Sequence, residues 1–234
     1  MTYALYIGDR SYSSWSLRGW LMLERFGLPF ETHEVGLYTG RMQDDIAHLA
    51  PARTVPILQT PEGHVLSDSL AIAETLAERH PEAGLWPADP AARALARSMV
   101  AEMHSGFAAL RRECAMNLRH GWAGFVVSDA VSADLARIEA LWALARDGHG
   151  GAWLFGDYSL ADAFYAPVAT RIATYDLPVS AASRDYVGRH LACPALQAWR
   201  ARGMADDYET PPYAQDLATV AWSEVCARYG AEVR

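Results

Sequence analysis

The chain has 234 residues and a formal net charge of -8 at pH 7, and all 20 of its basic side chains are arginine because the sequence contains no lysine. The missing lysine excludes a Schiff-base lysine, a pyridoxal phosphate anchor and the lysines of phosphate-binding loops and kinases. The acidic balance argues against nucleic-acid and acidic-membrane binding, which need a basic surface. The hydrophobic fraction of 51% and the charged fraction of 21% are those of a globular protein.

The cysteines and the first residues predict a cytoplasmic protein. Cys114, Cys193 and Cys226 are widely spaced and form no C-x-x-C pair, which fits a reducing compartment. The first ten residues have no basic region and no long apolar run, so we expect no secretory signal. No stretch approaches the ~20 apolar residues of a membrane span. The eight histidines show no metal-ligand spacing, so we expect no metal.

The first 80 residues predict a mixed domain. Their patterns favour strands over residues 3–7, 30–35, 55–59 and 64–66, and helices over residues 17–26 and 69–79. The first strand–helix–strand unit implies a parallel pair, to which a hairpin adds antiparallel strands. The stretch between the second strand and the hairpin is expected to be irregular or helical.

The remaining residues predict a helical domain after a short linker. Residues 81–90 contain three prolines and a glycine, which suit a linker. Alanine, the best helix former, occurs 9 times in residues 1–90 and 33 times in the remaining 144. We expect helices at about residues 91–119, 129–147, 159–174, 184–191, 194–202 and 213–229.

Three serines, Ser13, Ser14 and Ser16, lie where the first strand leads into the first helix. One serine is explained as an N-cap, whose hydroxyl accepts a hydrogen bond from an unpaired backbone N–H group. A helix N-terminus is also an anion-binding site. The cluster alone therefore leaves both a structural and a functional interpretation open.

Two further short motifs precede elements of the first domain. Val55 and Pro56 enter a strand, a position that proline tolerates, and a cis bond there would expose the backbone of Val55 to a ligand. Asp68 and Ser69 precede a helix, where they either cap it or bind the ammonium and carboxylate groups of a ligand.

A fourth motif lies in the second domain, where Ser159 is followed three residues later by Asp162. This spacing is a variant of the capping box, with aspartate in place of the usual glutamate or glutamine. We expect it to start a central helix and to take no part in chemistry.

In this order, the four motifs resemble the glutathione S-transferase superfamily over nearly the whole chain. The resemblance implies an α/β plus all-α fold, with a thioredoxin-like domain at residues 1–80, a linker at 81–90 and an all-helical domain at 91–234. The serine motif is most similar to the Ser-Ser-Cys-Ser motif of the zeta class and belongs with the serine-type enzymes, including theta and delta. The family also implies glutathione as co-substrate and a homodimer.

The resemblance implies that Ser13 donates a hydrogen bond to the glutathione sulfur, with Ser14 as the alternative. A thiol with a pKa near ~8.5 is mostly protonated at neutral pH. A hydroxyl donor and the positive end of a helix favour the thiolate. Lowering the thiol pKa by about two units corresponds to roughly 2.7 kcal/mol.

The resemblance also implies how the rest of glutathione is bound. Val55, before a cis Pro56, would exchange backbone hydrogen bonds with the cysteinyl part, and Asp68 and Ser69 would bind the γ-glutamyl end. With no lysine available, Arg53 is the first choice for the glycyl carboxylate and Arg41 the second.

A pocket for the second substrate is expected between the domains. The candidates are aromatic or basic side chains near the junction: Tyr12, Trp15, Phe107, Arg111, Trp122 and Tyr165. For each aromatic side chain the alternative is packing in the core, and for Arg111 it is a solvated helix face.

The expected activity is transfer of a small hydrophobic electrophile to the glutathione sulfur, without nucleic-acid or membrane partners. Trp15 stands where the zeta class has cysteine, so the isomerisation of maleylacetoacetate is not carried over. The alternatives are a glutathione-dependent isomerase or dehalogenase, which would use the same thiol site, and a non-catalytic binding protein of the same fold.

Overall fold

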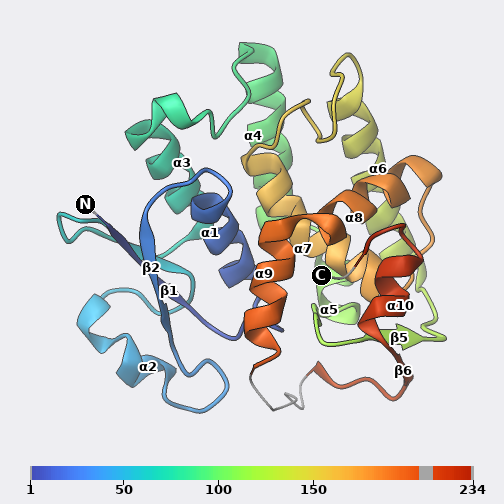
Figure 1. Ribbon diagram of the computed structural model, residues 1–234, viewed down its shortest axis with the longest axis horizontal. Coiled ribbons are helices and arrows are strands. Elements are labelled where there is room, and N and C mark those ends of the chain that lie inside the picture. Colours follow the sequence, from blue (N-terminus) through green and yellow to red (C-terminus); the bar gives the residue numbers. More distant parts are fainter. Residues whose placement is uncertain (1, 206–212, 233–234) are drawn as a thin grey trace.

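The computed structural model describes residues 2–205 and 213–232. Its first part is a four-stranded sheet (Figure 1). In the spatial order β2-β1-β3-β4, the strands are β1 (Tyr3–Ile7), β2 (Phe30–Glu34), β3 (Ile57–Gln59) and β4 (Val65–Leu66). β1 pairs parallel with β2 and antiparallel with β3, which pairs antiparallel with β4. The predicted parallel pair and hairpin are therefore confirmed.

Helices cover both faces of this sheet, namely α1 (Ser14–Glu24), α3 (Ser69–Arg79), α2 (Met42–Asp45) and the 3-10 helix η1 (Ala47–Leu49). Successive residues of a strand point to opposite faces. Leu5 therefore packs in the cluster that contains the apolar side chains of α1 and α3, whereas Tyr6 packs against the cluster of Ile46 and Leu49 at α2 and η1. Helices α1 and α3 therefore pack on one face of the sheet, and α2 and η1 pack on the other.

The second part is helical, as predicted (Figure 1). After the 3-10 helix η2 (Pro81–Ala83) its helices are α4 (Pro90–Ser105), α5 (Ala108–Glu113), α6 (Asp129–Arg146), α7 (Leu160–Thr174), α8 (Ala181–Ala192), α9 (Pro194–Gly203) and α10 (Trp222–Ala227). Every residue of α7 is buried. Ser159 and Asp162 form the predicted capping box at its N-terminus. Among the described residues no helix is long and apolar enough to cross a membrane.

Two predicted helices of the second part differ from those observed. The run expected over residues 91–119 is divided, because Gly106 and Phe107 leave the helical conformation and Phe107 has a φ of 53°. The helix expected over residues 213–229 is reduced to α10. Before it, β6 (Ala218–Val220) pairs antiparallel with β5 (Gly121–Ala123). That pairing joins segments about a hundred residues apart, which the local pattern of either segment does not reveal.

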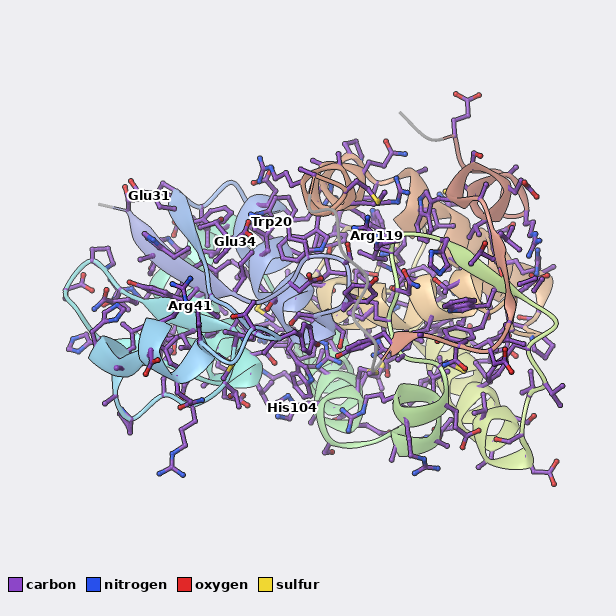
Figure 2. All side chains as sticks on the ribbon, turned by 90° about the horizontal axis from the view of Figure 1, so that it is seen from below. Trp20, Glu31, Glu34, Arg41, His104 and Arg119 are labelled. Carbon is purple, nitrogen blue, oxygen red and sulfur yellow. The ribbon has the colours of Figure 1, made fainter. Side chains whose placement is uncertain are left out.

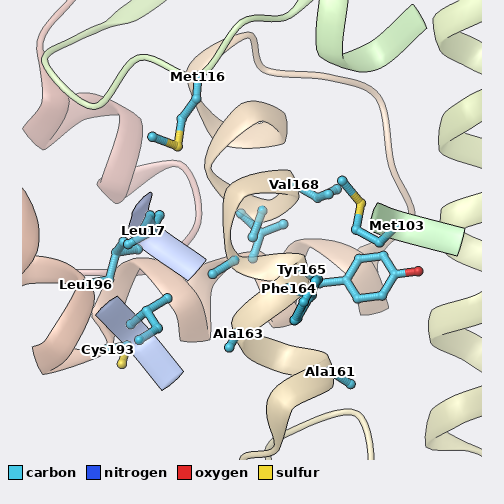
Figure 3. Packing of buried hydrophobic residues seen from close by; sticks show 14 of the residues in the cluster. Leu17, Met103, Met116, Ala161, Ala163, Phe164, Tyr165, Val168, Cys193 and Leu196 are labelled. Carbon is cyan, nitrogen blue, oxygen red and sulfur yellow. The ribbon is translucent and has the colours of Figure 1, made fainter. Parts of the chain in front are cut away.

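One continuous cluster of buried apolar side chains joins the two parts. Figure 3 shows the centre of this cluster, where Leu17 of α1 and Leu196 of α9 lie on one side of α7 and Met103 of α4 lies on the other. Helices α1 and α7 are in direct contact. The N-terminus of α1 is therefore held at the junction of the two parts. A domain division at residues 81–90 remains a proposal.

Candidate active site

A cleft of about 640 Å³ lies at the junction. It brings together nine of the residues singled out from the sequence, namely Tyr12, Ser13, Ser14, Trp15, Val55, Pro56, Asp68, Ser69 and Arg111. They come from four separate segments, which the sheet and the packing of α1 against α7 place around one hollow.

Five predicted site residues do not line this cleft, three of them aromatic and two of them arginines. Phe107 is buried in the core, and Trp122 lies on β5 with its ring against His120. Tyr165 is fully buried on α7 and donates a hydrogen bond to the Met99 carbonyl, 3.2 Å away. These three aromatic side chains pack in the core, which is the alternative that the sequence analysis left open for them.

Arg53, the first choice for the glycyl carboxylate, is exposed and lines a separate shallow hollow beside η1. Its backbone carbonyl accepts a hydrogen bond from Gln43 at 3.2 Å. Arg41, the second choice, is also outside the cleft and contacts Asp45 at 3.4 Å (Figure 2). Both arginines are exposed, and neither lines the cleft.

The N-terminus of α1 forms the floor of the cleft. Ser13 is the N-cap, and its Oγ accepts a hydrogen bond from the Ser16 N–H at 3.3 Å. The Ser13 hydroxyl donates to Ser16 Oγ at 2.8 Å, so it must turn from Ser16 in order to donate to a ligand. Ser16 Oγ in turn accepts a hydrogen bond from the Gly8 N–H. The first turn of α1 contains no acidic side chain. The positive end of this helix therefore faces the cleft without a negative side chain of its own to neutralise it.

The loop before β3 forms the next side of the cleft. The Val55-Pro56 peptide bond is cis, and both residues line the cleft. Gly19 of α1 lies against Pro56, because a Cβ added at Gly19 would come within 2.8 Å of the proline Cβ. Glycine at position 19 therefore permits the close approach of α1 to this loop.

The N-terminus of α3 completes the first-domain side. Asp68 is its N-cap and accepts hydrogen bonds from the N–H groups of Leu70 at 2.7 Å and Ala71 at 3.3 Å. Ser69 is 1% exposed, and its hydroxyl has no hydrogen-bond partner in the described part of the chain. A buried hydroxyl that lines a cleft without a partner is a ready hydrogen-bonding group for a ligand.

The second part reaches the same end of the cleft through His104. Figure 2 labels this side chain where α4 meets the first part. Its Nε2 lies 3.4 Å from an Asp68 carboxylate oxygen, and its ring stands edge-on to Trp15 at 5.2 Å. The two parts of the chain therefore meet directly beside the predicted ammonium-binding carboxylate.

Among the cleft-lining residues that the sequence analysis did not name as site candidates, Arg171 and Tyr213 have polar groups placed beside the predicted serines and Tyr12. Arg171 is on α7, with its Nη2 3.4 Å from Ser14 Oγ. Tyr213 lies between Tyr12 and Tyr38, at 5.0 and 5.5 Å between ring centroids, and its hydroxyl hydrogen-bonds that of Tyr38. The sequence does mark Arg171, because it is the one charged residue in the second half of the predicted central helix. No local feature marks Tyr213, because the pattern over residues 213–229 predicts a helix there.

Three arginines gather where α1 meets the helical part of the chain. Arg171 and Arg111 line it, and Arg18 lies beneath it on α1. Burial, together with the charges of Arg171 and Arg111, lowers the pKa of Arg18 to about 9. Burial lowers the pKa of Arg171 to about 10. Both remain cations at neutral pH. Within residues 2–205 and 213–232 no group of side chains is arranged to hold a metal ion.

Comparisons with known proteins agree with this geometry. Residues 12–79 match the family model described as "Glutathione S-transferase, N-terminal domain". The chain is 30% identical over 181 residues to a probable maleylacetoacetate isomerase of Caenorhabditis elegans, covering 75% of this chain and 81% of that protein. It is 34% identical over 173 residues to a maleylacetoacetate isomerase of Pseudomonas aeruginosa, covering 70% and 78%.

A solved structure has the same fold. The crystal structure of a glutathione transferase homologue from Burkholderia gl BGR1, with bound glutathione, superimposes with a TM-score of 0.67. The two sequences are 27% identical, and the match covers 88% of this chain and all of that one.

Proposed function

Because this chain belongs to the glutathione S-transferase superfamily, we propose that its cleft activates the thiol of glutathione for a glutathione-dependent isomerisation. The observation that carries this proposal is the N-terminus of α1, where Ser13 and Ser14 face the cleft and no acidic side chain occupies the first turn. A hydroxyl donor and an uncompensated helix N-terminus both favour a thiolate over a thiol.

The same cleft offers contacts for the other parts of glutathione. Asp68 carries the charge for the γ-glutamyl ammonium, and the unpaired Ser69 hydroxyl at the start of α3 suits the adjacent carboxylate. The backbone of Val55 lies beside the cis proline at the cleft, where the cysteinyl part would pair with it. Arg53 has no place in this proposal, because it lies outside the cleft.

The proposed reaction needs no oxidant and consumes no glutathione. The thiolate adds to one carbon of a cis double bond conjugated to a carbonyl group, and the electron pair of that bond moves to the carbonyl oxygen. Rotation about the resulting single bond follows. The enolate then re-forms the double bond in the trans arrangement and expels the thiolate. Ser13 stabilises the thiolate before the addition and after the elimination.

Isomerisation is preferred to the transfer reaction expected from the sequence because the curated relatives at 30% and 34% identity are named maleylacetoacetate isomerases. The transfer reaction begins with the same addition of the thiolate. It differs in the last step, in which the enolate is protonated and a stable conjugate remains. Trp15, in place of the zeta-class cysteine, is compatible with this proposal because neither step requires a thiol from the protein.

The test combines calorimetric titration of glutathione with a catalytic assay on maleylacetoacetate. We expect saturable binding and a trans product that forms only when glutathione is present, with no loss of free thiol. Accumulation of a conjugate, or release of halide from a haloalkane, would establish a transferase or a dehalogenase instead. Absence of glutathione binding would leave a non-catalytic protein. Light scattering tests the proposed homodimer.

A further inference from the structure

A second hollow, of about 530 Å³, lies between the end of α1 and the loop that joins α6 to α7 (Figure 1). Its volume is within the range of small-molecule sites in proteins. We call it the loop hollow, and its larger lining side chains are those of Arg25, Trp153, Phe155, Asp157 and Tyr158. It shares no lining residue with the cleft, so the proposed function makes no use of it.

The loop that forms one wall of the loop hollow is held in a fixed shape. The N–H groups of Trp153 and Gly156 donate to each other's carbonyl groups at 3.2 and 3.3 Å, which closes a tight turn. Gly151 packs against this turn, because a Cβ added there would come within 2.6 Å of the Gly156 carbonyl oxygen. The Leu154 N–H donates to the carboxylate of Asp162 at 3.2 Å, which ties the turn to the start of α7.

Arg25 brings a positive charge to the loop hollow. It is the C-cap residue of α1 and is half-buried. Its guanidinium carbon lies 4.2 Å from the Tyr158 ring centroid and 5.7 Å from that of Trp153. Within residues 2–205 and 213–232 this side chain forms no hydrogen bond or ion pair, and its Nε is buried. Uncharged ring faces therefore hold a cation whose charge the described chain does not neutralise.

Asp157 brings the opposite charge to the same hollow. It is exposed, and its carboxylate has no hydrogen-bond or ion-pair partner in the described part of the chain. Arg25 and Asp157 thus line one hollow without forming a salt bridge with each other. A simple anion bound there would be repelled by Asp157, and a simple cation would be repelled by Arg25. A ligand that carries both charges satisfies the two residues at once.

Aromatic side chains form the apolar part of the loop hollow. Trp153 and Tyr158 stand edge-on to each other with their ring centroids 4.8 Å apart, and both are only half-buried. Phe155 adds a third ring to the lining. Aromatic rings offer large apolar areas and prefer edge-to-face or offset contacts with another ring. The apolar part of a ligand is therefore expected to be a ring.

We infer that the loop hollow binds a free aromatic α-amino acid as its zwitterion. Arg25 binds the carboxylate, for which its planar fork offers two parallel hydrogen bonds. Asp157 accepts hydrogen bonds from the ammonium group, and the ring of the ligand lies against Trp153 and Tyr158. This site goes beyond the proposed function and does not depend on it.

Calorimetric titration of L-phenylalanine into the full-length protein tests the inference. The protein is saturated with S-methylglutathione, which keeps the amino acid out of the proposed γ-glutamyl site at Asp68. We expect saturable binding with a Kd of about 1 mM or tighter. Absence of such binding would overturn the inference. If S-methylglutathione itself does not bind, the proposed function fails, and the titration is done on Asp68→Asn, which removes the charge of that site.

Ligands that each lack one group test the three contacts in the wild type. L-Phenylalaninamide lacks the carboxylate, 3-phenylpropionate lacks the ammonium group and L-alanine lacks the ring. We expect each to bind at least about 10-fold more weakly than L-phenylalanine. Equal binding of 3-phenylpropionate would reduce the hollow to an anion site, and equal binding of L-alanine would remove the ring contact. Either result would contradict a site for an aromatic amino acid.

Two variants assign the charged contacts. We expect Arg25→Gln and Asp157→Asn each to weaken L-phenylalanine binding at least about 10-fold. Arg112→Gln is the matched control, since Arg112 is exposed and pairs with Glu113 at 3.1 Å, and it should change the affinity less than about 2-fold. Unchanged affinity in a folded hollow variant, or an equal loss in the control, would overturn the assignment. Thermal unfolding checks Arg25→Gln, and the exposed Asp157 decides if that variant is unfolded.

Discussion

Helices α1 and α7 both begin with a serine N-cap, but their N-termini have different surroundings. Ser13 caps α1 and is followed three residues later by Ser16, while Ser159 caps α7 and is followed three residues later by Asp162. Asp162 is fully buried and accepts hydrogen bonds from Ser159 and Leu154 N–H groups and from the Tyr186 hydroxyl. The N-terminus of α7 is thus neutralised by a carboxylate and closed within the core.

The N-terminus of α1 has no acidic side chain in its first turn and opens into the cleft. Its positive end is available to a ligand, whereas that of α7 is occupied by the protein itself. A capping serine therefore indicates a binding site only when the first turn lacks its own carboxylate and the helix end reaches a cleft. Substitutions at the two helices should accordingly separate stability from activity.

The largest effect is expected at the closed helix. Asp162→Ala removes the acceptor of two backbone N–H groups and of the Tyr186 hydroxyl, all in the core. Each buried donor left unpaired costs about 1–3 kcal/mol, so we expect a loss of about 3–5 kcal/mol in the free energy of unfolding. Chemical denaturation measures it. Asp157→Ala, at an exposed residue of the same loop, is the control and should change stability by less than about 0.5 kcal/mol.

At the open helix the effect should fall on activity. Ser13→Ala removes the proposed donor to the sulfur, and a rise of about one unit in the thiol pKa corresponds to about 1.4 kcal/mol, so we expect kcat at neutral pH to fall by up to about 10-fold. The cap itself is worth about 1 kcal/mol of stability. Steady-state kinetics with saturating glutathione measures the change. Ser159→Ala should show the opposite combination, a loss of stability with unchanged kcat. If Ser14→Ala lowers kcat and Ser13→Ala does not, Ser14 is the donor.

The buried carboxylate also predicts a pH dependence. Burial raises the pKa of Asp162 to about 6, against ~3.9 in an unfolded chain. Between these values the folded state holds a proton that the unfolded state has released. The free energy of unfolding therefore falls as pH rises through this window, by on the order of 3 kcal/mol for about two pKa units.

Asp162→Asn should abolish this contribution, and the difference between wild type and variant isolates it. The subtraction is needed because His190 acts with the opposite sign. Burial and the charge of Arg25 lower the pKa of His190 to about 3, so its contribution to stability rises with pH between about 3 and 6.5. Denaturation at pH 4 and at pH 7 provides the measurement. A difference that does not vary with pH would contradict the raised pKa of Asp162.

A smaller effect is expected at α3, whose capped N-terminus also lines the cleft. Asp68→Asn keeps an N-cap acceptor for the Leu70 and Ala71 N–H groups but removes the charge. We expect glutathione affinity to fall about 10-fold, with stability changed by less than about 0.5 kcal/mol. Asp89→Asn, at the cap of α4 outside the cleft, is the matched control. Unchanged affinity in Asp68→Asn would remove this carboxylate from the ammonium site.

The smallest effect is expected where sequence and structure disagree. Arg53 is exposed and lines another hollow, so Arg53→Gln should change glutathione affinity by less than about 2-fold. Calorimetry under the same conditions decides this. A loss of 10-fold or more would mean that the loop before β3 brings Arg53 to the ligand on binding.

Features encoded within a few residues were predictable from the sequence. The serine caps, the Val-Pro entry into β3 and the box formed by Ser159 and Asp162 depend on neighbours close along the chain, and the structure has them where they were expected. The helices over α6, α7 and α9 followed from long periodic or alanine-rich segments.

Features that depend on distant partners were not predictable. β5 and β6 are stabilised by pairing with each other. Phe107 adopts a left-handed backbone conformation between α4 and α5, which the local sequence pattern does not predict. Arg171 and Tyr213 reach the cleft from α7 and from the segment before β6. The aromatic candidates Phe107, Trp122 and Tyr165 pack in the core instead, because large aromatic side chains are more often buried than placed in a pocket.

The central claim is that the open N-terminus of α1 stabilises a glutathione thiolate. The direct measurement is the absorbance of the thiolate of bound glutathione as a function of pH, in the wild type, in Ser13→Ala and in Ser159→Ala. We predict a bound thiol pKa about two units below ~8.5 in the wild type and in Ser159→Ala, and at least about one unit higher in Ser13→Ala. A bound thiol that titrates near ~8.5 in the wild type would contradict the claim.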